Sequence, residues 1–279
     1  MCIQSAVGHV LFSLRRLLDK VPFSRRFTHR AAALVRRVLP EWRVWLKIEG
    51  GFAKGLWFRL NLPAEWSYWL GYHEPVVQEI LQRWCKPGSV FYDVGAHLGF
   101  FSFAVAKAAG PGGKVYAFEP DPENCLRFKE IAIRNNLESR VQLVEAGVWS
   151  YASPGVPFRR GSRGTAQGGV ASDGITPVLA NGALASVPTV TLDHFVRQGN
   201  PVPAVIKIDV EGGECQVLEG SEEVFARSKP VLICEVHRAE AAQWIADWLA
   251  RKGYTASWRI PEESFPRLLI GEALRKGVS

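Results

Sequence analysis

The most constraining feature of this chain is the segment at residues 89–102, which reads SVFYDVGAHLGFFS. An apolar run ends at Asp93, a turn containing Gly95 and Gly99 follows, and a second apolar run then begins. This order is typical of a strand, a tight glycine turn and a helix. In open α/β sheets, ligands bind at the carboxyl ends of the strands. The segment therefore predicts both a fold class and the place of a ligand site.

The chain downstream continues the alternation of strands and helices. We predict strands at residues 89–94, 114–118, 141–146, 204–209 and 230–236, and helices at residues 76–84, 99–109, 122–135, 214–220 and 239–252. Short connections between such elements favour a parallel sheet covered on both faces. Two extended pieces near the end, at 255–260 and 267–270, predict a closing antiparallel hairpin.

The first 60 residues differ from the rest in charge. Ten Lys or Arg and three Asp or Glu lie within residues 1–50, so this segment carries the whole formal net charge of +7. Apolar spacings of three and four predict amphipathic helices over 5–39, and alternation around Gly50 and Gly51 predicts a hairpin over 42–62. The basic stretch either contacts an anionic membrane surface or packs on the main domain with its arginines in water.

The neutral remainder argues against a charge-driven nucleic-acid binder, because such binding depends on clustered positive charge. No apolar run is long enough to span a bilayer. The five cysteines are scattered without zinc-site spacing, which is typical of reduced thiols inside cells. We therefore expect a cytoplasmic protein that associates with membranes, if at all, only at their surface.

The turn after the first strand indicates the kind of ligand. A dinucleotide-binding turn would read G-x-G-x-x-G, whereas this turn reads G-x-x-x-G and follows Asp93. A carboxylate there repels a pyrophosphate and favours a cationic ligand, and S-adenosylmethionine is such a ligand. The second strand ends at Glu119, which can accept hydrogen bonds from ribose hydroxyls. The alternative is that both acids are ordinary helix caps.

Further acids follow the later strands. Asp209, Glu211 and Glu214 follow the strand at 204–209, and the strand at 230–236 contains Glu235 and is followed by His237. Four predicted strands thus end in an acid: Asp93, Glu119, Asp209 and Glu235. Core packing does not require this, so we expect a polar site at one edge of the sheet. Clustered carboxylates can also hold Mg²⁺, but no ligand set in the sequence is distinctive enough to assign a metal.

Several blocks of the chain together resemble a known family. They are DVGAHLGFFS, FEPDPEN, TLDHF, IKIDVEGGE and LICEVH, with GYHEP ahead of the first strand. In combination they resemble the FkbM-type S-adenosylmethionine-dependent methyltransferases, from about residue 71 to residue 237. The resemblance implies a Rossmann-like class I methyltransferase fold over 61–279, mostly parallel with a C-terminal antiparallel hairpin, after a basic helical and hairpin extension over 1–60. It also implies O-methylation of a hydroxyl on a sugar, glycan or polyketide-like acceptor.

The resemblance also implies which residues contact the cofactor. The residues that match the cofactor turn are Asp93, Gly95, Ala96, His97 and Gly99. Glu119 matches the acid that binds the ribose, and Glu74 of GYHEP is a candidate contact on the cofactor side. The family often has Asn in place of His97, so we expect this imidazole to form a wall of the cofactor pocket and to have no catalytic role.

On the acceptor side, Asp209, Glu211 and Glu214 match the acidic block that the family places near the transferred methyl. An alcohol is a poor nucleophile, and a nearby base helps it. We expect Asp209 or Glu211 to orient or deprotonate the acceptor hydroxyl, with His237 as the competing base. The glycine-rich stretch at 150–188 is predicted to be an irregular flap beside the active site.

Two other functions remain open from the sequence. One is an NAD-dependent oxidoreductase of the same fold class, and the other is a membrane-surface binding protein with a degenerate methyltransferase fold. The aromatic cluster formed by Trp66, Tyr68, Trp69 and Tyr72 is open in the same way, since it fits either a platform for sugar rings or a hydrophobic cap on the sheet.

Overall fold

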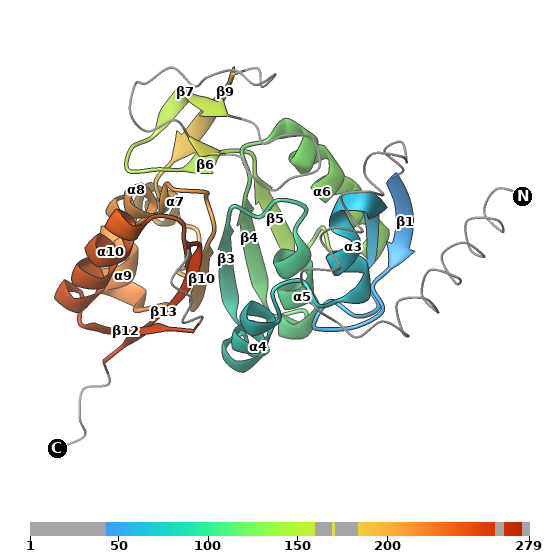
Figure 1. Ribbon diagram of the computed structural model, residues 1–279, viewed down its shortest axis with the longest axis horizontal. Helices are drawn as coiled ribbons and strands as arrows, with labels where there is room; N and C mark the ends of the chain where they lie inside the picture. The colour runs from blue at the N-terminus through green and yellow to red at the C-terminus, as the bar shows by residue number, and fades with distance from the viewer. Residues whose placement is uncertain (1–42, 160–168, 171–183, 260–264, 275–279) are drawn as a thin grey trace, which may run out of the picture.

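The computed structural model describes residues 43–159, 169–170, 184–259 and 265–274. At its centre lies a seven-stranded sheet with the order β12-β13-β11-β10-β3-β4-β5 (Figure 1). The strands are β3 (Val90–Val94), β4 (Lys114–Phe118), β5 (Val141–Val144), β10 (Val205–Ile208), β11 (Val231–Val236), β12 (Tyr254–Trp258) and β13 (Arg267–Ala273). Strands β11, β10, β3, β4 and β5 are parallel, while β13 runs antiparallel to β11 and β12. The predicted α/β fold with a closing antiparallel hairpin is confirmed.

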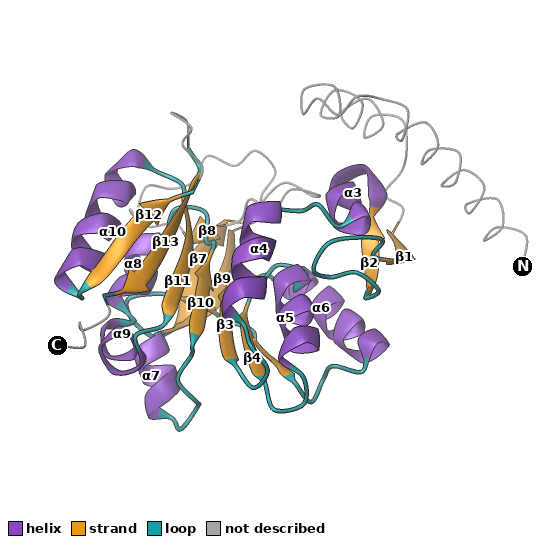
Figure 2. Cartoon of the chain, turned by 90° about the horizontal axis from the view of Figure 1, so that it is seen from below, coloured by secondary structure: helices purple, strands orange, loops and turns teal. Residues whose placement is uncertain are grey.

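Helices cover both faces of this sheet, as Figure 2 shows. One face packs against α3 (Leu62–Leu70), α4 (Pro75–Trp84), α5 (Phe100–Ala109) and α6 (Pro122–Asn135). The other packs against α7 (Leu192–Arg197), α8 (Glu214–Glu219), α9 (Glu222–Ser228) and α10 (Ala239–Arg251). Side chains alternate along each strand, so Phe91 lies in the first core and Tyr92 in the second. By the same alternation, Asp93 and Lys207 lie on the face that α3–α6 cover.

A hairpin precedes the first of these helices. Strands β1 (Arg43–Lys47) and β2 (Trp57–Asn61) pair antiparallel, as predicted. Phe58 of β2 is fully buried, and its ring centroid lies 5.9 Å from those of both Phe100 and Phe103 of α5. The hairpin therefore shares a core with the domain that follows it, and the division at residue 60 stays a prediction.

The helices predicted over 5–39 lie outside the described residues. Within the part of the chain that the structure describes, no helix is both long and apolar enough to cross a membrane.

A second, smaller sheet has the order β6-β9-β7-β8. Its strands are β6 (Gly147–Val148), β7 (Ser153–Arg159), β8 (Gly169–Val170) and β9 (Leu184–Val190). The irregular structure predicted over 150–188 is thus wrong for the described part, because β7 and β9 pair antiparallel around a small core of Val156, Phe158 and Val187. Its role as a flap beside the active site stays a prediction. Because β6 follows directly on β5, this sheet lies beyond the carboxyl ends of the parallel strands (Figure 1).

The order of the parallel strands reverses between β3 and β10. From β3 the chain proceeds to β4 and β5 on one side, and from β10 to β11 on the other. In open α/β sheets, ligands bind at the carboxyl ends of the strands beside such a reversal. The strand-end acids predicted from the sequence lie at this edge.

Candidate active site

The turn after β3 brings the backbones of neighbouring strands together. Gly95 has a φ of 78°, and a Cβ atom added there would lie 1.8 Å from the carbonyl oxygen of Asp209. Only glycine fits this position without a shift of the backbone. The N–H of Gly95 donates to the carbonyl of Phe118 at 3.0 Å, and the N–H of Asp209 donates to that of Val94 at 3.0 Å. The ends of β3, β4 and β10 are therefore tied to one another at this turn.

Asp93 lies beneath the turn with an exposed fraction of 1%. Its Oδ2 atom accepts a hydrogen bond of 2.6 Å from the Ser102 hydroxyl, and its Oδ1 atom has no hydrogen-bond partner among the described residues. Burial raises the pKa of Asp93, although Lys207 and the Ser102 hydroxyl oppose this rise. Helix α5 has Gly99 at its N-cap, so Asp93 is not a helix cap.

Glu119 is also buried, and it holds the turn from the side of β4. One of its oxygens accepts from the N–H of His97 at 2.8 Å, and the other accepts from the N–H of Asp121 at 2.9 Å. Burial raises the pKa of Glu119 to about 7. The N-cap of α6 is Asp121, so the helix-cap alternative is wrong for this acid as well. The oxygen that accepts from Asp121, Oε1, also accepts from Nδ2 of Asn124 at 3.3 Å, so Oε2 is the oxygen that keeps a second lone pair for a ligand. The ribose role of Glu119 stays a prediction.

His97 adopts a left-handed backbone conformation with a φ of 51°. Its Nδ1 atom lies 3.1 Å from the Tyr68 hydroxyl, and burial lowers the pKa of the imidazole to about 4. The ring is therefore neutral at neutral pH, and its role as a wall of the cofactor pocket stays a prediction. Next to it, Ala96 is buried, and a Cβ at Gly99 would clash with the ring of Phe128.

The aromatic cluster near this turn acts mainly as a hydrophobic cap. Tyr68 and Trp69 are buried in the first core, and the Tyr68 ring stacks on Phe100 with centroids 5.0 Å apart. Trp66 and Tyr72 pack edge-to-face and are only partly buried. A platform for sugar rings is therefore limited to the second pair.

Lys207 is a site residue that the sequence analysis missed. It lies opposite Asp93 in the register of β10 and β3, with an exposed fraction of 4%. Its Nζ atom is 3.2 Å from Oδ2 of Asp209, 3.9 Å from Oδ1 of Asp93 and 5.3 Å from the ring centroid of Phe101. Burial lowers the pKa of this ammonium, but Asp209 and Asp93 outweigh that effect and raise it. The sequence does contain a signal for this residue, because Lys207 stands between two isoleucines in a strand predicted to be buried, and lysine is rarely buried without a partner.

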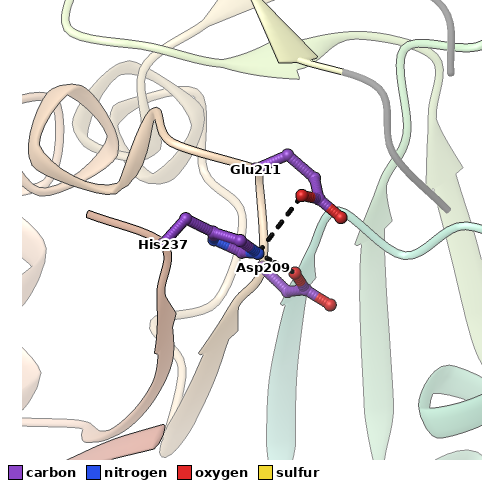
Figure 3. Close-up of side chains that lie close together, drawn as sticks. All are labelled: Asp209, Glu211 and His237. Carbon is purple, nitrogen blue, oxygen red and sulfur yellow. Dashed lines mark ion pairs between the residues drawn. The ribbon is translucent and has the colours of Figure 1, made fainter. Parts of the chain in front are cut away.

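At the ends of β10 and β11, Asp209, Glu211 and His237 come together (Figure 3). The Nε2 atom of His237 is 3.3 Å from Oε2 of Glu211 and 3.9 Å from Oδ1 of Asp209. Its Nδ1 atom lies 2.6 Å from Oε1 of Glu214, which is fully buried. Burial lowers the pKa of His237, but the hydrogen bond to Glu214 and the charges of Asp209, Glu214 and Glu211 raise it to about 9. Burial raises the pKa of Glu211.

On the other side of Asp209 lie Glu74 and Glu235, with carboxylate oxygens of all three residues within 4.8 Å of one another. Burial raises the pKa of Glu74, but the adjacent His73 outweighs this and holds it at about 2. Burial and the charges of Asp209 and Glu74 raise the pKa of Glu235 to about 8. We predicted Glu74 to be a cofactor-side contact, and its carboxylate lies against the acids that end β10 and β11.

The predicted site residues thus form two connected groups. One group runs from Asp93 through Lys207 to Asp209 and the acids around it. The other links Glu119 to the turn through the N–H of His97. Both groups meet at the β3 turn, where Gly95 touches the backbone of Asp209. The arrangement can bind a cationic ligand beside the turn and can accept a proton at the ends of β10 and β11.

The fold and the geometry define an α/β protein whose strand-end acids gather where the strand order reverses. The family model of the FkbM methyltransferase domain matches residues 93–256, which is more than half of the chain. The chain belongs to the FkbM methyltransferase family, and methyl transfer is the activity of its class.

The proteins to which the chain is similar include two curated relatives and one solved structure. The 31-O-demethyl-FK506 methyltransferase FkbM of Streptomyces tacrolimicus is 30% identical over 179 residues, which cover 56% of this chain and 68% of that protein. The hexuronic acid methyltransferase AglP of Haloferax volcanii is 28% identical over 165 residues, which cover 59% of this chain and 62% of that protein. A crystal structure of methyltransferase FkbM from Methylobacillus flagellatus is 18% identical with a TM-score of 0.48, covering 66% of this chain and 43% of that one.

Proposed function

We propose that this chain transfers a methyl group from S-adenosylmethionine to a hydroxyl oxygen of a sugar, glycan or polyketide-like acceptor. The observation that carries the proposal is the contact between the β3 turn and the acids that end β10 and β11. It supports a mechanism in which a cationic cofactor binds next to a group of proton acceptors. The names of the two relatives support an oxygen-bearing acceptor, since one specifies a 31-O-demethyl compound and the other a hexuronic acid.

The residues around the β3 turn fit S-adenosylmethionine. The buried Oδ1 atom of Asp93 has no hydrogen-bond partner among the described residues, and a cationic ligand would satisfy it. Oε2 of Glu119 accepts one hydrogen bond, from the N–H of His97, and keeps a lone pair for a hydroxyl donor. When bound, the cofactor supplies a methyl group activated by its positively charged sulfur and is left as S-adenosylhomocysteine.

On the acceptor side, the work of the chain is to align the hydroxyl and take its proton. Alignment with the methyl carbon matters because displacement is in line. As the bond from the acceptor oxygen to the methyl carbon forms, the hydroxyl proton passes to the carboxylate of Asp209 or Glu211. His237 is a weaker candidate for this base, because a pKa of about 9 keeps its imidazole protonated at neutral pH. Glu235, with a pKa of about 8, is also largely protonated there.

The membership of the family favours methyl transfer over the NAD-dependent oxidoreductase that the sequence left open. To test the acceptor class, the purified protein is incubated with S-adenosylmethionine and a panel of neutral sugars, uronic acids and polyketide macrolides. Mass spectrometry then identifies any methylated product and the atom that carries the new methyl group.

The role of the carboxylates is tested with Asp209→Asn and Glu211→Gln on whichever acceptor is methylated. We expect the variant without the base to lose turnover by about 10²–10⁴-fold while it still binds S-adenosylhomocysteine. Glu219→Gln serves as the matched control, because Glu219 is an exposed carboxylate on the nearby helix α8. Near-native turnover in both folded variants would contradict the carboxylate-base mechanism.

A further inference from the structure

We propose that Glu214 is a positioning residue, which fixes the imidazole of His237 and the turn that carries Glu211 in a single arrangement. Glu214 is the first residue of α8, and its side chain is fully buried. It takes no part in the proton transfer described above. Its importance for methyl transfer rests on the proposed function, whereas its contacts with the chain do not.

One carboxylate oxygen of Glu214 joins two segments of the site. Its Oε1 atom accepts a hydrogen bond of 2.8 Å from the N–H of Gly212 and lies 2.6 Å from Nδ1 of His237. Gly212 lies in the turn after β10, and His237 follows β11, so a single atom links the ends of both strands. With Nδ1 held in this way, Nε2 of His237 lies 3.3 Å from Oε2 of Glu211 (Figure 3).

The turn at residues 211–213 needs support because its backbone is unusual. Glu211 has a φ of 54°, a left-handed conformation that is unfavourable for a residue with a Cβ atom and persists only where surrounding contacts hold it. Nη2 of Arg238 donates to the carbonyl of Gly212 at 2.5 Å. Glu214 and Arg238 therefore hold the turn through both the N–H and the carbonyl of Gly212.

The burial of Glu214 is unfavourable unless its charge is used. Its Oε2 atom has no hydrogen-bond partner among the described residues, and burying such an oxygen is costly unless a positive charge lies close by. The imidazole of His237, when protonated, is that charge. An apolar side chain of similar size would meet the needs of packing at this position, so the carboxylate has its role toward His237.

The charges around His237 set its protonation. The acids that face it are Glu214 of α8, Asp209 and Glu211 after β10, Glu235 of β11 and Glu74 at the N-cap of α4, and the other titratable groups nearby are Lys207, His73 and Arg238. Burial lowers the pKa of His237, but the hydrogen bond to Glu214, followed by the charges of the acids, raises it to about 9. His237 therefore donates from both ring nitrogens at neutral pH and does not compete for the proton of the acceptor.

The first test is nuclear magnetic resonance of the full chain with ¹⁵N-labelled histidine, in which His237→Gln assigns the signals of the ring. In the folded wild type we expect both ring nitrogens to carry a proton at pH 7.5, with titration near pH 9. Glu214→Gln keeps the size of the side chain and loses its charge, so His237 should titrate about 1–3 pH units lower. Glu219→Gln, the same substitution at an exposed position of α8, should leave the titration unchanged.

The second test examines the turn by amide hydrogen exchange. Glu214→Leu fills the same space without an acceptor, so we expect the N–H of Gly212 to exchange about 10–100-fold faster than in the wild type. The amide of Ala104 in α5, which packs on the opposite face of the sheet, should not change. Circular dichroism verifies that each variant is folded, and if neither Glu214 variant folds, the protonation of the ring in the wild type decides.

A wild-type His237 with only one protonated ring nitrogen at pH 7.5 would overturn the proposal. An unshifted titration in folded Glu214→Gln, or unchanged exchange of Gly212 in folded Glu214→Leu, would do the same.

Methyl transfer and binding of S-adenosylhomocysteine are measured in parallel. In Glu214→Gln we expect turnover to fall by about 10–100-fold with unchanged affinity for S-adenosylhomocysteine. Full turnover in this variant would overturn the positioning role and leave the proposed function standing. The expected spectra from a wild type that neither binds the cofactor nor transfers a methyl group would keep the arrangement fixed by Glu214 and remove the proposed function.

Discussion

At the residue scale, Lys207 connects the two halves of the site. Its ammonium lies between the acid that ends β3 and the acid that follows β10, and it has almost no access to water. A buried ion pair of this kind costs desolvation of every charge involved, and removal of one partner leaves the others unpaired. Asp93 is one such partner, because burial raises its pKa and Lys207 opposes that rise.

We therefore predict that Lys207→Met raises the pKa of Asp93 further. As the pH falls, cofactor binding that needs the ionised carboxylate should then be lost at a pH about 1–3 units higher than in the wild type. The measurement is the affinity for S-adenosylhomocysteine from pH 5 to pH 9, with Lys207→Arg as the control that keeps the charge. A variant that only loosens the fold would bind more weakly at every pH, and an unshifted profile in folded Lys207→Met would refute the prediction.

At the element scale, a buried ion pair fastens α3 to α6. Arg127 makes two contacts with Glu65, from Nη1 to Oε1 at 2.8 Å and from Nη2 to Oε2 at 2.6 Å. The same Oε2 accepts from the N–H of Asn61, and Nη2 also donates to the carbonyl of Arg59 at 2.7 Å. The pair therefore joins the hairpin, α3 and α6 on the face of the sheet that carries Asp93.

Removal of one partner should destabilise the protein strongly. We expect Glu65→Leu or Arg127→Met alone to lower the free energy of unfolding by about 3–5 kcal/mol, because each leaves a buried charge unpaired. The double variant should lose clearly less than the sum of the two. Urea unfolding followed by circular dichroism measures all three, and strictly additive losses would show that the two side chains are not coupled.

The longer elements are predicted well from the sequence because the hydrophobic period of a helix or strand repeats several times within each of them. Helices α7 and α9 were missed, since they are 6 and 7 residues long and make fewer than two turns. Helix α3 was also missed, and its residue Glu65 has non-helical backbone angles. Strands β7 and β9 lie in a stretch rich in Gly, Ser and Pro, where composition favours a loop over a strand.

The site residues likewise differ in how far the sequence pattern predicts their positions. The acids at strand ends follow from the alternation of strands and helices, because parallel strands share one carboxyl edge. The role of Lys207 depends on the register that sets it opposite Asp93, and a single sequence does not reveal register. The place of Glu74 depends on how the start of α4 packs against β10 and β11. Such long-range contacts are fixed only when the whole domain folds.

At the scale of the whole molecule, one hydrophobic core packs against each face of the sheet. The candidate site lies at the edge formed by the carboxyl ends of the parallel strands. The strand order reverses at β3 and β10, and the smaller sheet lies beyond the same edge (Figure 1). The basic segment at 1–50 lies almost entirely outside the described residues, so its contact with a membrane surface stays a prediction. The activity depends on whether the cofactor binds at the reversal.

The most direct test is calorimetric titration of the full chain with S-adenosylmethionine and S-adenosylhomocysteine, alongside Asp93→Ala and Glu119→Ala. We predict saturable binding of one ligand per chain. Loss of a charge-assisted hydrogen bond costs about 1.5–3 kcal/mol, so each substitution should weaken binding by roughly 10–100-fold. Folded wild-type protein that binds neither ligand, or variants that bind as tightly as the wild type, would contradict the assignment of the β3 turn as the cofactor site.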